Sequence, residues 1–172
     1  MTRAEEPTDS DRAWAGLCVP GSAQGPCREL AISLVASWIL QMEAEGHAVD
    51  MACGGETYQG TAHSHLDHLA VLSDAQAGAP LPANPPEGVS LLVVARGSDH
   101  AIPAESVVSP SRGRSSRSAA VAVVLSDSEA DAQTVRSAGW EVVRLGEAVK
   151  LEDAGVRLAQ FCAAADRQAW HE

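Results

Sequence analysis

Histidine and aspartate side chains crowd into one short segment near the middle of the 172-residue chain. His63, His65, Asp67 and His68 follow one another in the pattern His-x-His-x-Asp-His. Imidazole nitrogens and carboxylate oxygens are ligands that Zn²⁺ prefers, and a hydroxide held by zinc is a strong nucleophile at neutral pH. The segment is therefore a candidate for a hydrolytic metal centre.

The pattern resembles the metal motif of metallo-β-lactamase-fold hydrolases. The resemblance implies that His63 and His65 bind one zinc ion, and that Asp67 and His68 bind a second. This interpretation makes the chain a zinc-dependent hydrolase, which we keep as the alternative function.

The residues around this motif favour a different interpretation. In the resembling family the motif follows an apolar strand, but residues 56–62 are polar and contain glycine. Ser64-x-x-Asp67 has the form of a capping box, and Leu66 and Leu69 suit the core. We therefore expect a solvated helix start here and assign no metal, cofactor or catalytic residue.

A second candidate group lies at the ends of predicted strands. Cys53 ends one strand, Ser98-Asp99-His100 follows another, and Ser126-Asp127 follows a third. Ligands of open α/β sheets bind at the carboxyl ends of strands, where these residues could provide a nucleophile, a base and an orienting acid. The alternative, which we favour, makes Cys53 a core residue, His100 a loop residue and Asp127 a helix-start acid.

The stretch 111–118 is a basic island that contains Arg112, Arg114 and Arg117. It could dock an acidic partner or phosphate, but a solvated loop explains it equally simply. We found no phosphate-binding loop and no Gly-x-Gly-x-x-Gly after a strand, so nucleotide binding has no support.

The overall composition narrows the class of function. The formal net charge is −11, which argues against binding to nucleic acid or to anionic lipid. No apolar run is long enough to cross a membrane, and the acidic start is unlike a signal peptide. We therefore expect a cytoplasmic protein whose four cysteines, Cys18, Cys27, Cys53 and Cys162, are free thiols.

Helical patterns alternate with apolar runs along the chain, which predicts a three-layer α/β domain with a mostly parallel sheet. Strands are expected over 48–53, 56–59, 89–95, 119–125 and 140–145, and helices over 26–45, 64–73, 126–138 and 151–170. Residues 1–19 are expected to form a partly disordered arm, tacked on by Trp14, Leu17, Cys18 and Val19, and residues 20–172 a single domain. No hydrophobic strand is expected before Ala31.

Four segments in order resemble one family. They are Pro26-Cys27-Arg28-Glu29-Leu30-Ala31-Ile32-Ser33-Leu34-Val35-Ala36-Ser37, Glu45-Gly46-His47-Ala48-Val49, His65-Leu66-Asp67-His68-Leu69-Ala70 and Arg136-Ser137-Ala138-Gly139-Trp140-Glu141-Val142-Val143. They are similar to motifs of the domain of unknown function 58 family, von Willebrand factor A-like proteins commonly encoded beside MoxR-type AAA+ ATPases. The resemblance covers about residues 20 to 145.

The family's metal-binding Asp-x-Ser-x-Ser sequence occurs nowhere in this chain. The resemblance therefore implies a von Willebrand factor A-like fold without an intact metal site. On this basis we expect a non-enzymatic protein-interaction module, with a MoxR-type AAA+ ATPase as the implied partner.

Overall fold

The computed structural model describes residues 12–20, 25–73, 76, 78–81, 85, 88–96, 101–104, 107–110 and 120–145. In chain order the elements are β1 (Arg12–Cys18), α1 (Gly25–Ala44), β2 (Ala48–Cys53), β3 (Glu56–Gln59), α2 (Ala62–Ala70), β4 (Val89–Ala95), β5 (Ala120–Leu125), α4 (Glu129–Ser137) and β6 (Glu141–Leu145). Several predictions concern residues outside the described ones. They are the disorder of residues 1–10, the basic stretch 111–118, the helix over 151–170 and the free thiol of Cys162.

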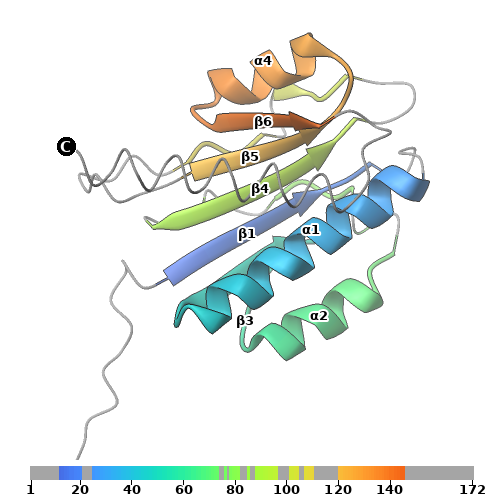
Figure 1. Cartoon of the computed structure of the whole chain (residues 1–172). Helices are drawn as coiled ribbons and strands as arrows, with labels where there is room; N and C mark the ends of the chain where they lie inside the picture. The colour runs from blue at the N-terminus through green and yellow to red at the C-terminus, as the bar shows by residue number, and fades with distance from the viewer. Residues whose placement is uncertain are drawn as a thin grey trace, which may run out of the picture.

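The strands of the described chain form one mixed sheet in the order β3-β2-β1-β4-β5-β6 (Figure 1). Every neighbouring pair is parallel except β2 and β3, which are antiparallel. The predicted α/β class, with a mostly parallel sheet flanked by helices, is confirmed.

Strands β2 and β3 are joined by the two-residue turn Gly54-Gly55. Both glycines have positive φ angles, 63° and 79°. A tight hairpin requires this left-handed backbone at both central positions, and glycine adopts it without steric cost. The turn therefore explains why the chain reverses here, whereas the other neighbouring strands of the sheet run parallel.

Strand β1 corrects the prediction that no hydrophobic strand precedes Ala31. Arg12–Cys18 lies in the middle of the sheet, between β2 and β4. Its sequence, RAWAGLC, is rich in alanine and glycine, which have low strand propensity, and it is buried on both faces, so it shows no polar alternation. Residues 12–18, which the sequence assigns to the N-terminal arm, therefore form part of the sheet.

The two faces of the sheet carry separate cores. On one face, Ala13, Ala15 and Leu17 of β1 pack in the cluster that contains the buried residues of α1 and α2. On the other face, Trp14 packs in a cluster that contains Val135 of α4. Helices thus cover both faces of the sheet, and the carboxyl ends of its parallel strands share one edge.

Helix α1 confirms the helix predicted over residues 26–45. Its buried side chains are Cys27, Leu30, Ala31, Leu34, Val35, Trp38 and Ile39. The apolar residues recur three and four positions apart, which places them along one side of a helix. Gly46, which has a φ of 90°, follows the end of this helix as predicted.

Two tryptophans stack on the opposite face of the sheet. The ring centroids of Trp14 and Trp140 are 6.2 Å apart, and the indole Nε1 of Trp140 donates a hydrogen bond to the Val108 carbonyl at 2.6 Å. Gly16 lies directly beneath the Trp14 ring, and any Cβ at position 16 would collide with it. Gly16 therefore allows the indole to lie flat along β1.

Candidate functional site

Helix α2 distributes the histidine-rich motif around its circumference. His65 is fully buried, and its Nε2 lies 2.7 Å from the Val49 carbonyl oxygen. Since a carbonyl only accepts, this nitrogen carries the hydrogen and donates it. His63 and Asp67 form an exposed pair at 3.7 Å on another side of the helix, and His68 stacks on Tyr58.

The structure therefore does not bring the four side chains of the motif together. Residues two apart on a helix point to different sides, so His63 and His65 diverge. The second ring nitrogen of His65, Nδ1, is buried without a hydrogen-bond partner among the described residues. Over the same residues, no group of three or more His, Cys, Asp or Glu side chains is placed to hold a metal ion.

The capping box expected at Ser64 and Asp67 is wrong, because α2 begins two residues earlier. Thr61 is the N-cap, and its hydroxyl accepts a hydrogen bond from the Ser64 amide at 3.2 Å. Ala62 and His65 then point inward. The imidazole that the sequence presents as a zinc ligand is held in place by strand β2.

Cys53 is a core residue and not an activated nucleophile. Its side chain is fully buried in the cluster beneath α1 and α2. Burial, assisted by the nearby carboxylate of Glu56, raises the pKa of this thiol to about 11. A nucleophilic cysteine needs the thiolate form, which this environment disfavours.

The other members of the strand-end group do not join Cys53. Asp127 is exposed, and it follows β5. Strands β1 and β4 lie between β2 and β5, and three strand spacings amount to about 14 Å. Ser98, Asp99 and His100 lie outside the described residues.

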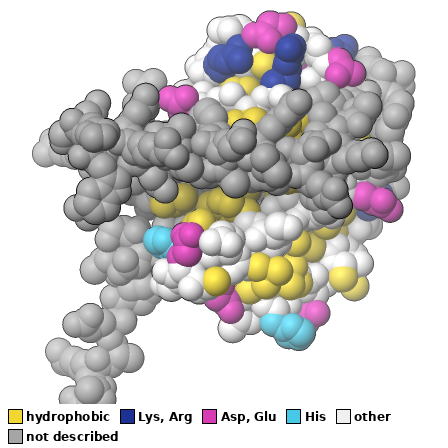
Figure 2. Space-filling view, viewed as in Figure 1, with side chains coloured by type: hydrophobic (Ala, Val, Ile, Leu, Met, Phe, Trp, Pro, Cys, Tyr) yellow, Lys and Arg dark blue, Asp and Glu magenta, His cyan; other side chains and the backbone are white. Residues whose placement is uncertain are grey.

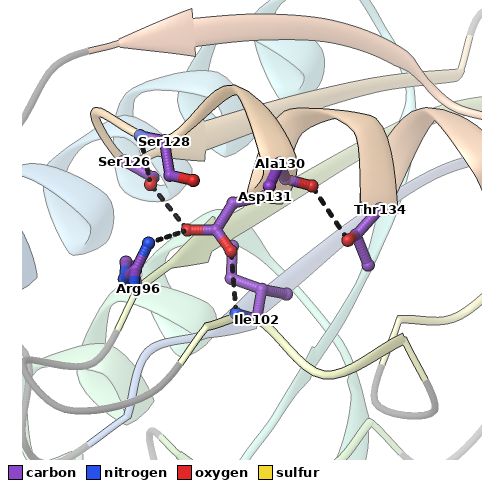
Figure 3. Close-up of polar contacts among 7 residues, drawn as sticks. All are labelled: Arg96, Ile102, Ser126, Ser128, Ala130, Asp131 and Thr134. Carbon is purple, nitrogen blue, oxygen red and sulfur yellow. Dashed lines mark hydrogen bonds and ion pairs between the residues drawn. The ribbon is translucent and has the colours of Figure 1, made fainter.

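The most highly connected polar group of the described chain is one that the sequence did not reveal. Asp131, in the first turn of α4, is 1% exposed, and its carboxylate accepts three hydrogen bonds (Figure 3). The donors are the hydroxyl of Ser126 at 2.7 Å, the amide of Ile102 at 3.0 Å and the guanidinium of Arg96 at 3.3 Å. This Asp131 network joins the ends of β4 and β5 to α4.

Ser126 lies between β5 and α4 and does not cap the helix. Helix α4 begins at Glu129, and its N-cap Ser128 makes no capping bond with its side chain. Instead, Ser126 accepts a hydrogen bond from the Ser128 amide at 3.0 Å while it donates to Asp131. The helix expected over residues 126–138 is therefore present, but it begins three residues later than predicted.

The Asp131 network is suited to holding the backbone. A buried carboxylate is costly unless it is paired and hydrogen-bonded, and here Arg96 supplies the opposite charge. Arg96 and Ile102 both follow β4 in the chain, and the same carboxylate binds the side chain of one and the backbone of the other. No signal in the sequence separates Asp131 from an ordinary exposed helix acid.

Comparison with known proteins gives no relative. The chain matches no protein-family model, no curated protein and no solved structure. Over the described residues, none of the helices combines the length and the apolar character needed to cross a membrane.

Proposed function

We propose that this chain is a von Willebrand factor A-like domain that acts as a non-enzymatic protein-interaction module in the cytoplasm. The mostly parallel sheet with helices on both faces supports this assignment, since it is the architecture that the family resemblance implies. The resemblance also supplies the partner class, a MoxR-type AAA+ ATPase.

Strand β1 adds support that the sequence pattern alone did not provide. It occupies the centre of the sheet, where a strand bearing the Asp-x-Ser-x-Ser sequence would be expected, but it ends in Leu17-Cys18 and is followed by Val19-Pro20. The chain is then a relative in which the strand is retained and the metal-binding residues are replaced.

The observation that carries a non-catalytic role is the engagement of the reactive side chains in holding the fold. His65 donates to the Val49 carbonyl, Asp131 accepts from three segments, and Cys53 is a buried thiol with a raised pKa. A catalytic group must reach its substrate in the required protonation state. These three groups instead stabilise the strand ends and the helices.

The test uses the purified full chain and the MoxR-type ATPase encoded in the same genome. We expect a complex by size-exclusion chromatography with a Kd below about 50 μM, as is usual for a specific transient interface. Cys18→Ser is a matched control, because the proposal requires no thiol chemistry at the end of β1. Absence of binding up to that concentration would contradict the proposed partner.

A further inference from the structure

Strands β5 and β6 present one continuous apolar surface on the side of the sheet that faces α1. Its side chains belong to the α1 core cluster or pack against it, and they are Val121, Val123, Leu125, Val143 and Leu145. The strand register places Val123 beside Val143 and Leu125 beside Leu145, so these side chains adjoin one another. Val123, Leu125 and Leu145 are fully buried. We call the five residues the β5–β6 face.

The described helices give the β5–β6 face no covering element of its own. Helix α1 packs against β1, β2 and β4, and α4 packs against β5 and β6. Val135 of α4 belongs to the other core cluster, so α4 lies on the opposite side of the sheet. Figure 1 shows α1 and α2 away from β6. Since strands buried on both sides need a cover on each, the β5–β6 face requires a further segment.

The charged side chains of this end of the sheet lie mainly on the α4 side. Arg144 of β6 pairs with Glu129 of α4 at 3.1 Å, and Glu129 also pairs with Arg136 at 2.6 Å. Figure 2 shows basic and acidic side chains gathered over α4 at the top of the molecule. The β5–β6 face therefore suits an apolar cover and offers no charged anchor.

The sequence directly after β6 contains a segment of suitable pattern and length. Apolar residues recur three and four positions apart, and they are Leu151, Ala154, Leu158, Phe161, Cys162 and Ala165. In a helix this stripe is about 21 Å long. It matches the length of a six-residue strand such as β5, which spans about 20 Å. Residues 146–150 remain as the link that reverses the chain.

We propose that residues 151–170 form a helix that runs antiparallel to β6 and covers the β5–β6 face. The occupant is a segment of the same chain because it follows β6 directly, which gives it a high effective concentration at this surface. Phe161, the one phenylalanine of the sequence, provides the largest side chain of the stripe. The inference does not depend on the proposed function, and it implies that a partner protein binds elsewhere.

Cross-linking tests where the segment lies. If Leu151 starts level with Leu125, Cys162 lies about 17 Å further along the helix and Val121 about 13 Å back along β5, so the two come close. We expect Val121→Cys, oxidised with diamide in the full chain, to form a disulfide within one chain between position 121 and Cys162, detected by peptide mapping. Ala122→Cys is the matched control, because Ala122 belongs to the opposite core cluster and should form none.

Three outcomes of this experiment would overturn the inference. They are no disulfide from position 121, equal disulfide formation from positions 121 and 122, and a disulfide that joins two chains instead of closing within one.

A second experiment tests the stripe itself with two identical substitutions. Ala165 lies on the stripe, and Ala163 lies on the opposite side of the same helix. Ala165→Asp should lower the urea midpoint of unfolding by about 1 M or more, since it buries a carboxylate without a partner. Ala163→Asp should change the midpoint by less than about 0.3 M. Failure of Ala165→Asp alone to fold would also support the inference, whereas equal midpoints for the two variants would overturn it.

Discussion

Trp14 and Trp140 meet across two intervening strands because the residues between them are small. Trp14 lies opposite Ser90 in β4, Ser90 lies opposite Ala120 in β5, and Trp140 immediately precedes Glu141, the partner of Val121. Their indole planes are inclined by 28° and stack over the small side chains of Ser90 and Ala120. The first strand is thereby connected to the last one through side chains alone.

A larger side chain at position 120 should therefore separate the two indole rings. We expect Ala120→Leu to destabilise the fold by about 1 to 3 kcal/mol, as is usual when methylene groups are forced into a packed site. Urea unfolding measures the loss, and near-ultraviolet circular dichroism reports the indole pair. Ala120→Ser adds one small atom and is the control; if it matched Ala120→Leu in both measurements, the steric explanation would fail.

Removal of the Asp131 carboxylate should be costly because three donors lose their acceptor. We expect Asp131→Ala to reduce the free energy of unfolding by about 2 to 4 kcal/mol, with the partial exposure of Arg96 moderating the effect. The neighbouring exposed Asp127→Ala should stay within about 0.5 kcal/mol of the native chain. Chemical denaturation of both variants checks this, and similar values for the two would show that the network contributes little.

The buried thiol of Cys53 predicts a loss of stability in alkali. Its pKa is about 11 in the folded chain and 9.0 for an ordinary thiol, so above pH 9 the unfolded chain releases a proton that the folded chain retains. Stability should therefore fall between pH 9 and 11, by about 1 to 2 kcal/mol from this group. Burial also raises the pKa of Cys18, which acts in the same direction.

The contribution of Cys53 is isolated by comparison with Cys53→Ala. The variant should show a shallower decline over the same pH range when both proteins are unfolded by urea at each pH. Equal slopes for the two proteins would assign the alkaline loss to other groups.

His65 should matter for packing and not for metal content. We expect His65→Ala to cost about 2 to 4 kcal/mol, because it leaves a cavity and removes the donor to Val49. The exposed His63→Ala should change stability by less than about 0.5 kcal/mol. Zinc measured in protein purified without chelator should be the same for both variants and the native chain; near-stoichiometric zinc lost with either substitution would restore the hydrolase interpretation.

Elements with a strong periodic signal could be predicted from the sequence. The apolar runs of β4 and β5 and the stripe of α1 reflect burial on both sides or on one side, which leaves a direct trace in residue order. Strand β1 left no such trace, because an alanine- and glycine-rich segment reads as a strand only when its two neighbours are known. The predicted starts of α2 and α4 differ from the observed ones, because several Ser, Thr and Asp residues near each start could serve as the N-cap.

The candidate site was less predictable than the fold because its contacts join distant parts of the chain. Whether His65 faces solvent or β2 depends on how α2 packs, which the local pattern does not specify. Asp131 differs from Asp127 in that Arg96, Ile102 and Ser126 donate to its carboxylate, and the first two come from the segment after β4. The residue types suggested which groups could be reactive, whereas the tertiary contacts decide which of these groups are buried and hydrogen-bonded within the fold.

The antiparallel hairpin also bears on the behaviour of the protein at high concentration. The edge strand of a sheet has unpaired amide and carbonyl groups that can pair with a strand of another molecule. A long apolar edge strand is the most prone to such aggregation. The edge strand next to β2 is β3, which has only four residues and exposes Glu56, Thr57 and Gln59 to solvent. Because β3 is short and polar, it covers the edge of the apolar strand β2 and prevents β2 from pairing with strands of other molecules.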